Sequence, residues 1–360
     1  MTIGDLPARL RRRIRAEGPL TVATFMAEAL GEYYGSRDPL GAARAEGGGD
    51  FITAPEISQM FGELIGAWVA EQWQALGRPS PIHLVELGPG RGTLMADALR
   101  VLRRVPGLLD AARIQLVETS PSLRRRQRAA LGPTEITWHN ALGKVPDGPL
   151  LLIANEFFDA LPVRQLVHGE DGWAERCVGL DGERFAWLLD GRTGPLLVPP
   201  ELRDAPPGSV VELCPAGVAI AGDIGARIVR SGGAALLIDY GYATPTLAPT
   251  LQAVRAHRFA EFLEAPGEAD LTAHVDFGAL AGAARAAGAA AHGPIDQGIL
   301  LRRLGIVERA GALRRLASAA QAADIDAALA RLIDDAAMGT LFKALALTGP
   351  GAAPPPGFAA

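Results

Sequence analysis

The sequence predicts an α/β fold with a mostly parallel, Rossmann-like sheet, an N-terminal helical extension and an antiparallel β insertion. Residues 82–87 form an apolar run of strand length that leads through three alternate glycines into a helix-compatible run at 94–102. Strand, glycine turn and helix are the first unit of nucleotide-binding α/β domains. Residues 150–154 are apolar throughout, as expected of a central parallel strand. Residues 163–210 hold short strand-like runs joined by glycine turns, which is typical of antiparallel hairpins.

Composition narrows the class of protein. The 360 residues can bury a large core, and a content of 49% hydrophobic and 21% charged residues is ordinary for a globular protein. A net charge of −5 argues against sequence-independent nucleic-acid binding. There is no apolar run of transmembrane length, no signal peptide, no metal-type cysteine or histidine spacing and no disulfide framework. We therefore expect a cytoplasmic protein without stable membrane insertion or a bound metal.

Residues 1–80 are predicted to form the N-terminal helical extension. A glycine-rich loop at 35–49 precedes Thr53, Pro55 and Glu56. Thr53 and Glu56 have capping-box spacing, and Pro55 lies in the first turn of the predicted helix. A segment of this kind can close over a pocket, but the pattern alone favours the simpler interpretation that it only caps a helix. The apolar residues among 55–76 would suit a homodimer interface, but core packing explains them equally well.

The predicted catalytic domain covers residues 81–348. Strands at 114–118 and 136–139 end next to Glu118 and Asn140, and the strand at 150–154 runs into Asn155 and Glu156. Ligands bind beyond the carboxyl ends of such strands, where an acid can accept hydrogen bonds from ribose hydroxyls. The arginine-rich segment 124–128 is predicted to be the solvated face of a helix.

The rest of the chain is predicted from composition and periodicity. After the β insertion we expect a helix at 211–230, a strand at 234–242, an irregular stretch at 243–272 and a helix at 275–287. A strand at 289–295, a helical insertion at about 297–338 and a last strand at 341–347 follow. The alanine- and proline-rich tail at 349–360 is predicted to be disordered.

The glycine turn excludes two common nucleotide motifs. A dinucleotide fingerprint counted from Gly88 would need glycine where Thr93 stands, and Glu118 lies thirty positions on, rather than about 20. A P-loop is excluded because no Gly-Lys-Ser/Thr follows. The pattern Glu86-x-Gly88-x-Gly90-x-Gly92 instead resembles motif I of class I S-adenosylmethionine (SAM) methyltransferases.

Further segments resemble, in order, the motifs of the MidA-like family, which comprises a mitochondrial complex I assembly-factor arginine methyltransferase and its bacterial relatives. The match runs from about residue 19 to 347, through motifs at 51–63, 86–94, 155–162, 239–241, 255–258 and 267–277. The resemblance implies a class I SAM-dependent methyltransferase and, in the eukaryotic member, dimethylation of an arginine on a complex I subunit. We thus expect a protein arginine N-methyltransferase that acts on a complex I subunit and aids its assembly. The alternatives are a non-catalytic SAM-binding assembly factor and a small-molecule methyltransferase.

The resemblance also suggests roles for individual residues. Glu156 first and Asp159 second are the candidate catalytic acids, since a carboxylate pair can hold a guanidinium and accept its proton; the structural alternative is that they only brace the turn. His257 and Arg258 are candidate substrate-binding residues, with a solvated loop as the alternative. The candidate cofactor-binding residues for SAM are Glu86, Gly88, Gly90, Gly92, Glu118, Asn140, Ala141, Asn155, Thr53, Pro55 and Glu56.

Overall fold

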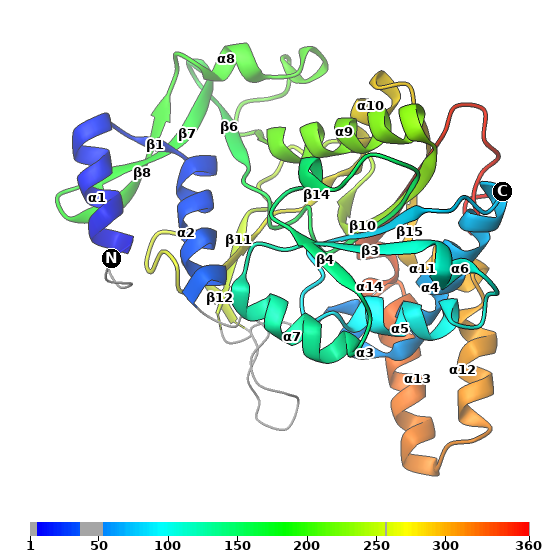
Figure 1. The fold of residues 1–360 in the computed structure, drawn as a ribbon. Coiled ribbons are helices and arrows are strands. Elements are labelled where there is room, and N and C mark those ends of the chain that lie inside the picture. Colours follow the sequence, from blue (N-terminus) through cyan, green and yellow to red (C-terminus); the bar gives the residue numbers. More distant parts are fainter. Residues whose placement is uncertain (1–5, 37–52, 256–257, 360) are drawn as a thin grey trace. The chain divides into compact units, whose positions relative to one another are not determined.

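The computed structural model describes residues 6–36, 53–255 and 258–359 (Figure 1). The chain divides into two compact units. The sheet unit spans residues 52–158, 218–243 and 277–360, and the accessory unit spans residues 1–51, 159–217 and 244–276. The described part of each unit is considered by itself.

The sheet unit is built on a mixed, mostly parallel sheet, as predicted. Its strand order is β15-β16-β10-β5-β2-β3-β4. The strands from β10 to β4 are parallel, whereas β16 runs antiparallel to β10 and β15. The strands are β2 (Ile82–Leu87), β3 (Ala112–Val117), β4 (Ile136–His139), β5 (Leu150–Asn155), β10 (Gly233–Tyr242), β15 (Ala290–Asp296) and β16 (Phe342–Thr348).

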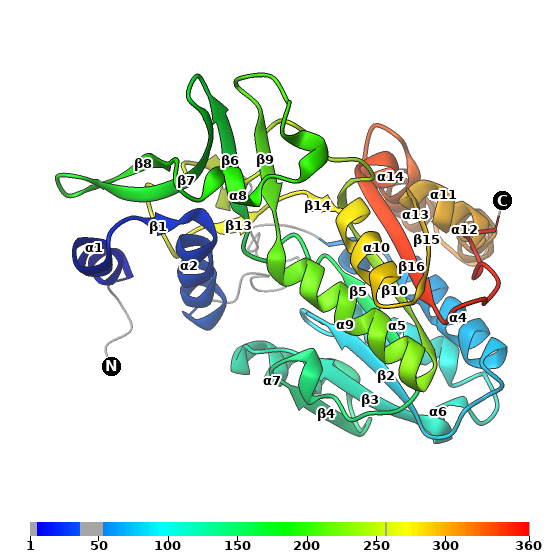
Figure 2. The ribbon, with the colours of Figure 1, turned by 90° about the horizontal axis from the view of Figure 1, so that it is seen from above.

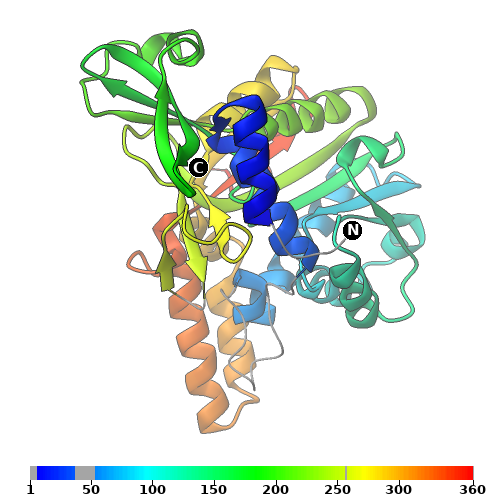
Figure 3. The ribbon, with the colours of Figure 1, turned by 90° about the vertical axis from the view of Figure 1, so that its left-hand side faces the viewer.

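Helices cover both faces of this sheet. In Figures 1 and 2, α9 (Pro215–Ser231) and α10 (Phe277–Ala286) lie on one face, and α4 (Gln59–Ala75) and α5 (Thr93–Leu102) on the other. Figure 3 shows α12 (Ile306–Arg314) and α13 (Ala319–Ile333) side by side, in orange. The remaining helices are α3 (Ala54–Ile57), α6 (Leu108–Ala111), α7 (Pro121–Leu131), α11 (Gln297–Arg303), α14 (Met338–Leu341) and the 3₁₀ turn Leu142–Lys144.

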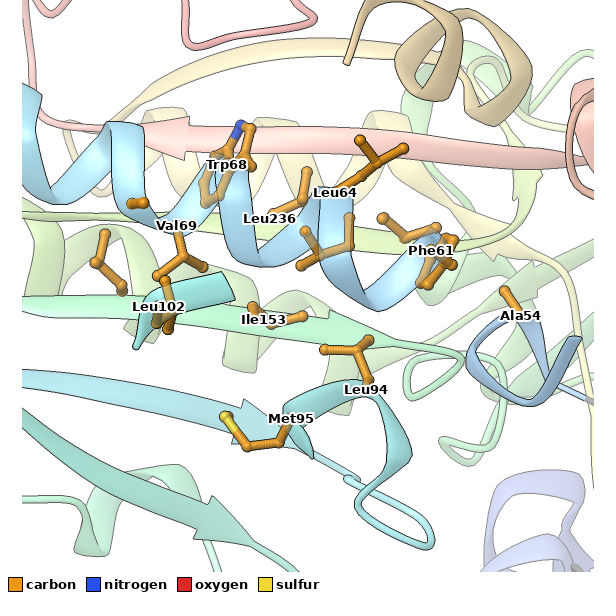
Figure 4. Packing of buried hydrophobic residues seen from close by; sticks show 14 of the residues in the cluster. Ala54, Phe61, Leu64, Trp68, Val69, Leu94, Met95, Leu102, Ile153 and Leu236 are labelled. Atoms are coloured by element: carbon orange, nitrogen blue, oxygen red, sulfur yellow. The ribbon is translucent and has the colours of Figure 1, made fainter. Parts of the chain in front are cut away.

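The core of the sheet unit lies between α4, α5 and the sheet. Figure 4 shows Val69 of α4 beside Leu102 of α5, and Trp68 of α4 and Ile153 of β5 belong to the same cluster. All four side chains are buried. Glycines allow the close helix packing, since a Cβ added at Gly66 would lie 2.8 Å from the Cα of Ala98. Packing within the unit therefore accounts for the apolar side of α4 without a dimer interface.

The accessory unit is antiparallel. Its larger sheet has the order β1-β7-β6-β9, with β8 paired to β7, and its smaller sheet has the order β12-β11-β13. The elements are α1 (Leu6–Glu17), β1 (Leu20–Thr21), α2 (Val22–Ser36), β6 (Arg164–Gly169), β7 (Gly172–Asp181), β8 (Arg184–Asp190), α8 (Gly194–Leu197), the 3₁₀ turn Pro200–Leu202, β9 (Val210–Leu213), β11 (Gln252–Arg255), β12 (Arg258–Ala260), β13 (Asp270–Thr272) and β14 (Val275–Asp276).

Several predicted elements differ from the observed ones. The helices predicted within 1–80 divide between the units: α3 and α4 belong to the sheet unit, while α1 and α2 pack in the accessory unit. Phe25 of α2 stands 5.4 Å, between ring centroids, from Phe185 of β8. A local pattern cannot show such a long-range contact. Residues 210–213 form a strand, and the stretch predicted to be irregular contains β11, β12 and β13.

The chain end also differs from the predicted disordered tail. Phe358 packs against the sheet-unit core, and Arg303 donates a hydrogen bond of 3.1 Å to the carbonyl of Gly357. The composition of the tail did not predict its packing, because a single aromatic side chain, that of Phe358, makes the contact with the core. Among the described residues, no helix combines the length and apolar character needed to cross a membrane.

The packing at Gly66 makes a testable prediction. In Gly66→Ala the new methyl group would meet the backbone of α5, and overpacking of this kind costs about 1–3 kcal/mol. We expect the free energy of unfolding, measured by denaturant titration, to fall by that amount. Gly282→Ala in α10 is the matched control, because a Cβ there meets nothing within 4 Å and alanine favours the helix. Equal stability of the two variants would contradict this packing.

Candidate functional site

The predicted site residues of the sheet unit gather at the carboxyl ends of adjacent parallel strands. Backbone hydrogen bonds join the end of β2 to that of β3, the end of β3 to that of β4, and the end of β5 to β10. Gly88 N donates to Val117 O, Glu118 N to His139 O and Glu156 N to Ile238 O, each at 3.0 Å. The strand order therefore brings together residues that are far apart in the sequence.

The glycine turn after β2 requires its three glycines. Gly88, Gly90 and Gly92 have φ values of 61°, 51° and 85°, in the left-handed region that disfavours other residues. A Cβ on Gly88 would lie 2.9 Å from the ring of Phe157, and one on Gly92 would lie 3.3 Å from the Cα of Gln127. All three glycines thus have a conformation that disfavours a side chain, Gly88 and Gly92 also lack the space for one, and the backbone at these positions can approach a ligand closely.

Two buried acceptors adjoin this turn. Glu86 is 3% exposed, and burial raises the pKa of its carboxyl to about 8. Within the described residues, Oε2 of Glu86 and Oδ1 of Asn155 have no hydrogen-bond partner. Because such groups are normally paired, a ligand with donor groups or positive charge would satisfy them. SAM, with its ammonium and sulfonium groups, fits this pair of acceptors and the glycine positions of the turn.

Glu118 is held by two donors. Its Oε1 accepts from Ser120 N at 2.7 Å and its Oε2 from Gln127 Nε2 at 3.2 Å. Burial raises the pKa of this carboxyl, and the hydrogen bonds from Ser120 and Gln127 oppose that shift. A carboxylate has about four lone-pair sites, so Glu118 retains acceptor capacity for a ligand.

Asn140 and Ala141 follow β4 and are exposed. The Oδ1 of Asn140 accepts a hydrogen bond from Arg124, which also donates from Nε to the carbonyl of Glu118 at 2.9 Å. Part of the arginine-rich segment predicted to be a solvated helix face therefore joins two strand ends.

Glu156 sits in a strained turn at the end of β5. Its φ of 50° is uncommon for a residue with a side chain, and such strain concentrates at functional sites. Its Oε1 accepts from Ala54 N at 2.8 Å and from Asn155 Nδ2 at 3.1 Å. The carboxylate is thus anchored to the first residue of α3.

A fully buried aspartate holds the backbone that follows Glu156. Oδ2 of Asp239 accepts from the backbone N–H groups of Phe157 and Phe158 at 3.1 and 3.0 Å. Sequence reasoning gave Asp239 no role in the site, although an acid directly after the apolar strand 234–238 was a usable signal.

The predicted capping box at α3 is wrong. Thr53 is the N-cap residue but its side chain makes no capping hydrogen bond. Glu56 instead accepts a hydrogen bond from the hydroxyl of Thr93 and one of 3.4 Å from Arg91 Nη1. These donors compete with the N-cap backbone for the carboxylate, and they tie α3 to the glycine turn. Pro55 is buried within α3. A lid function for Thr53, Pro55 and Glu56 stays a prediction.

The other predicted residues belong to the accessory unit. Asp159 is 6% exposed, and its carbonyl accepts from Ala273 N at 3.0 Å. Arg258 is exposed on β12, and His257 lies outside the described residues. A paired action of Asp159 with Glu156 stays a prediction. The part of the chain that the structure describes contains no group of three or more histidine, cysteine or acidic side chains placed to hold a metal ion.

Comparisons with known proteins identify the family. Residues 64–295 match a family described as "Putative S-adenosyl-L-methionine-dependent methyltransferase". The chain is similar to "Protein arginine methyltransferase NDUFAF7, mitochondrial" from Danio rerio, with 38% identity over 336 residues, 83% of this chain and 76% of the relative. The Homo sapiens protein of the same name is 38% identical over 331 residues, 82% of this chain and 72% of the relative.

A solved structure gives the same result. A Burkholderia thailandensis protein crystallised with bound S-adenosyl-homocysteine is 28% identical, covers 99% of this chain and 92% of its own, and has a TM-score of 0.79.

The comparisons correct one expectation and establish the family. The curated relatives are mitochondrial by name, and this finding overturns the expectation of a cytoplasmic protein, which was based on missing signal and membrane segments. A family model that covers most of the chain and relatives at 38% identity agree with the glycine turn and the strand-end acceptors. The chain belongs to this family of S-adenosylmethionine-dependent methyltransferases, and SAM is its cofactor.

Proposed function

We propose that this protein is a protein arginine N-methyltransferase that acts on a subunit of respiratory complex I and aids the assembly of that complex. Two findings support the arginine specificity: the similar proteins are named protein arginine methyltransferases, and the anchored carboxylate of Glu156 lies one strand away from the glycine turn. The complex I substrate rests on the family resemblance carried by the sequence motifs.

We propose that the sheet unit holds the cofactor along the ends of β5, β2, β3 and β4. The glycine turn admits the ligand close to the backbone, Glu86 and Asn155 face its methionine end, and Glu118 accepts from its ribose hydroxyls. Asn140 and Ala141 border the adenine, and Thr53, the N-cap of α3, lies with Pro55 and Glu56 of α3 over the ligand. When bound, SAM supplies an electrophilic methyl group.

Glu156 has the chemistry needed for an arginine substrate. A guanidinium remains protonated at any working pH, so a carboxylate that pairs with it must orient it and then accept a proton. The N–H of Ala54 and the amide of Asn155 hold Oε1 and so fix the plane of this carboxylate. Positioning of this kind contributes about 7–11 kcal/mol to catalysis in favourable cases. Asp159 is the proposed second acid, and His257 and Arg258 are proposed substrate contacts.

One observation favours a second candidate, a non-catalytic SAM-binding assembly factor. The hydrogen bond from Ala54 gives Glu156 a structural task, the anchoring of α3, which needs no chemistry. The two functions differ in whether label from the SAM methyl group reaches a protein.

Glu156→Gln tests the catalytic role directly. The glutamine oxygen can still accept from Ala54, so α3 stays anchored, but the charge and the proton acceptor are lost. We expect methyl transfer to fall by about 100-fold or more, as for removal of a general base, while binding of S-adenosylhomocysteine (SAH) persists. The assay follows labelled SAM in a lysate of a host that lacks the protein, where one labelled protein band is expected.

Glu135→Gln is the matched control, because Glu135 is an exposed acid before β4. Normal transfer by Glu156→Gln would refute the assignment. No label with intact SAH binding would support the assembly factor, and label only in small molecules would support a small-molecule methyltransferase.

Glu86 makes cofactor binding dependent on pH. With a pKa of about 8, its carboxyl is mostly protonated at pH 7 in the free protein. A cationic ligand favours the ionised form, so binding releases a proton and affinity rises with pH until it levels above about 8. Calorimetry with SAM in buffers of different ionisation enthalpy measures the released proton. Glu86→Gln should remove this component, and an equal proton count in the two proteins would contradict the assignment.

A further inference from the structure

Gln127 lies at the centre of a buried hydrogen-bond network that the proposed roles do not include. It is fully buried on α7, where Leu123, Gln127 and Leu131 follow helical spacing on the inner side. Its Nε2 donates to the carbonyl of Gly90 at 2.8 Å and to Oε2 of Glu118 at 3.2 Å. Its Oε1 accepts from the indole Nε1 of Trp138 at 2.7 Å.

The partners allow only one orientation of this amide. The indole nitrogen can only donate, so it must face the amide oxygen. The carbonyl of Gly90 and the carboxylate of Glu118 accept, so both must face the amide NH₂ group. Trp138 thereby prevents a flip of the Gln127 side chain, and both N–H groups stay directed at the glycine turn and at Glu118.

This network fixes the Glu118 carboxylate from both sides. Ser120 N occupies one oxygen at 2.7 Å and Gln127 the other, and these donors set the plane of the carboxylate and the direction of its remaining lone pairs. The same amide links Glu118 to Gly90. A change at Gln127 would therefore alter the acceptor of the ribose hydroxyls while leaving the strand that carries it intact.

We propose that Gln127 is a positioning residue that directs Glu118 at a vicinal diol, and so gives the protein its preference for a cofactor with both ribose hydroxyls. The inference rests on the proposed role of Glu118 as the ribose acceptor. A residue that only fills the core would affect ligands with and without a hydroxyl equally. If Gln127 directs Glu118, its replacement changes the ratio of the affinities for ligands with and without a ribose hydroxyl.

The test compares the affinity for SAH with that for its 2′-deoxy and 3′-deoxy analogues, by calorimetry on the full chain. We expect the wild-type protein to bind SAH about tenfold or more tightly than at least one analogue, as for a hydrogen bond to a charged group. In Gln127→Met and Gln127→Glu at pH 8 this ratio falls at least about fivefold. Because the result is a ratio of affinities, a general loss of stability does not imitate it.

Arg128→Met is the matched control. Arg128 is the next residue on α7, and its guanidinium lies 4.4 Å from the ring centroid of Trp138 without contacting the Gln127 amide in the network above. This variant perturbs the same tryptophan and should keep the wild-type ratio. Gln127→Glu adds a second variant that removes the two N–H donors while keeping the size of the side chain.

An unchanged ratio in both Gln127 variants would overturn the inference, as would an equal loss of the ratio in Arg128→Met. These outcomes are separate from failure of the proposed function. If no arginine becomes labelled but the ratios change as expected, the methyl acceptor is wrong and the role of Gln127 stands.

Discussion

The three glycines of the turn between β2 and α5 are the constraint on which the rest of the site depends. Positive φ values allow the backbone to reverse there, and the ring of Phe157 lies where a Cβ of Gly88 would be. The residues after β5 are therefore packed against the turn after β2. Asp239 of β10 holds Phe157 and Phe158 in place through their backbone N–H groups.

The short helix α3 is tied to two strand ends, to the residue after β5 through Glu156 and to the glycine turn after β2 through Glu56. Ala54, its first residue, donates to Glu156, and Glu56 accepts from Thr93 and Arg91. Glutamate serves in both contacts because its carboxylate accepts from backbone, hydroxyl and guanidinium donors alike. These hydrogen bonds place α3 between the glycine turn and Glu156, the proposed contact of the methyl acceptor.

The sequence predicted the parts of the fold that local patterns control. Mainly apolar runs of strand length predicted β2 and β5, and alternate glycines predicted the turn. Partners distant in the sequence could not be foreseen: the spacing of Thr53 and Glu56 suggested a capping box, but Thr93 and Arg91 compete successfully for the glutamate. Gln127 was hidden within an arginine-rich segment, although its spacing from Leu123 and Leu131 indicated a buried position. The helices α1 and α2 looked like a separate extension because their contacts with β8 are long-range.

A crystal structure of the wild-type protein with SAH is the most direct measurement of the central claim. The account predicts density across the ends of β2, β3 and β4, with the amino group beside Glu86 and Asn155 and the ribose hydroxyls on Glu118. Density for SAH at any other place, or an empty crevice at saturating SAH, would contradict the account.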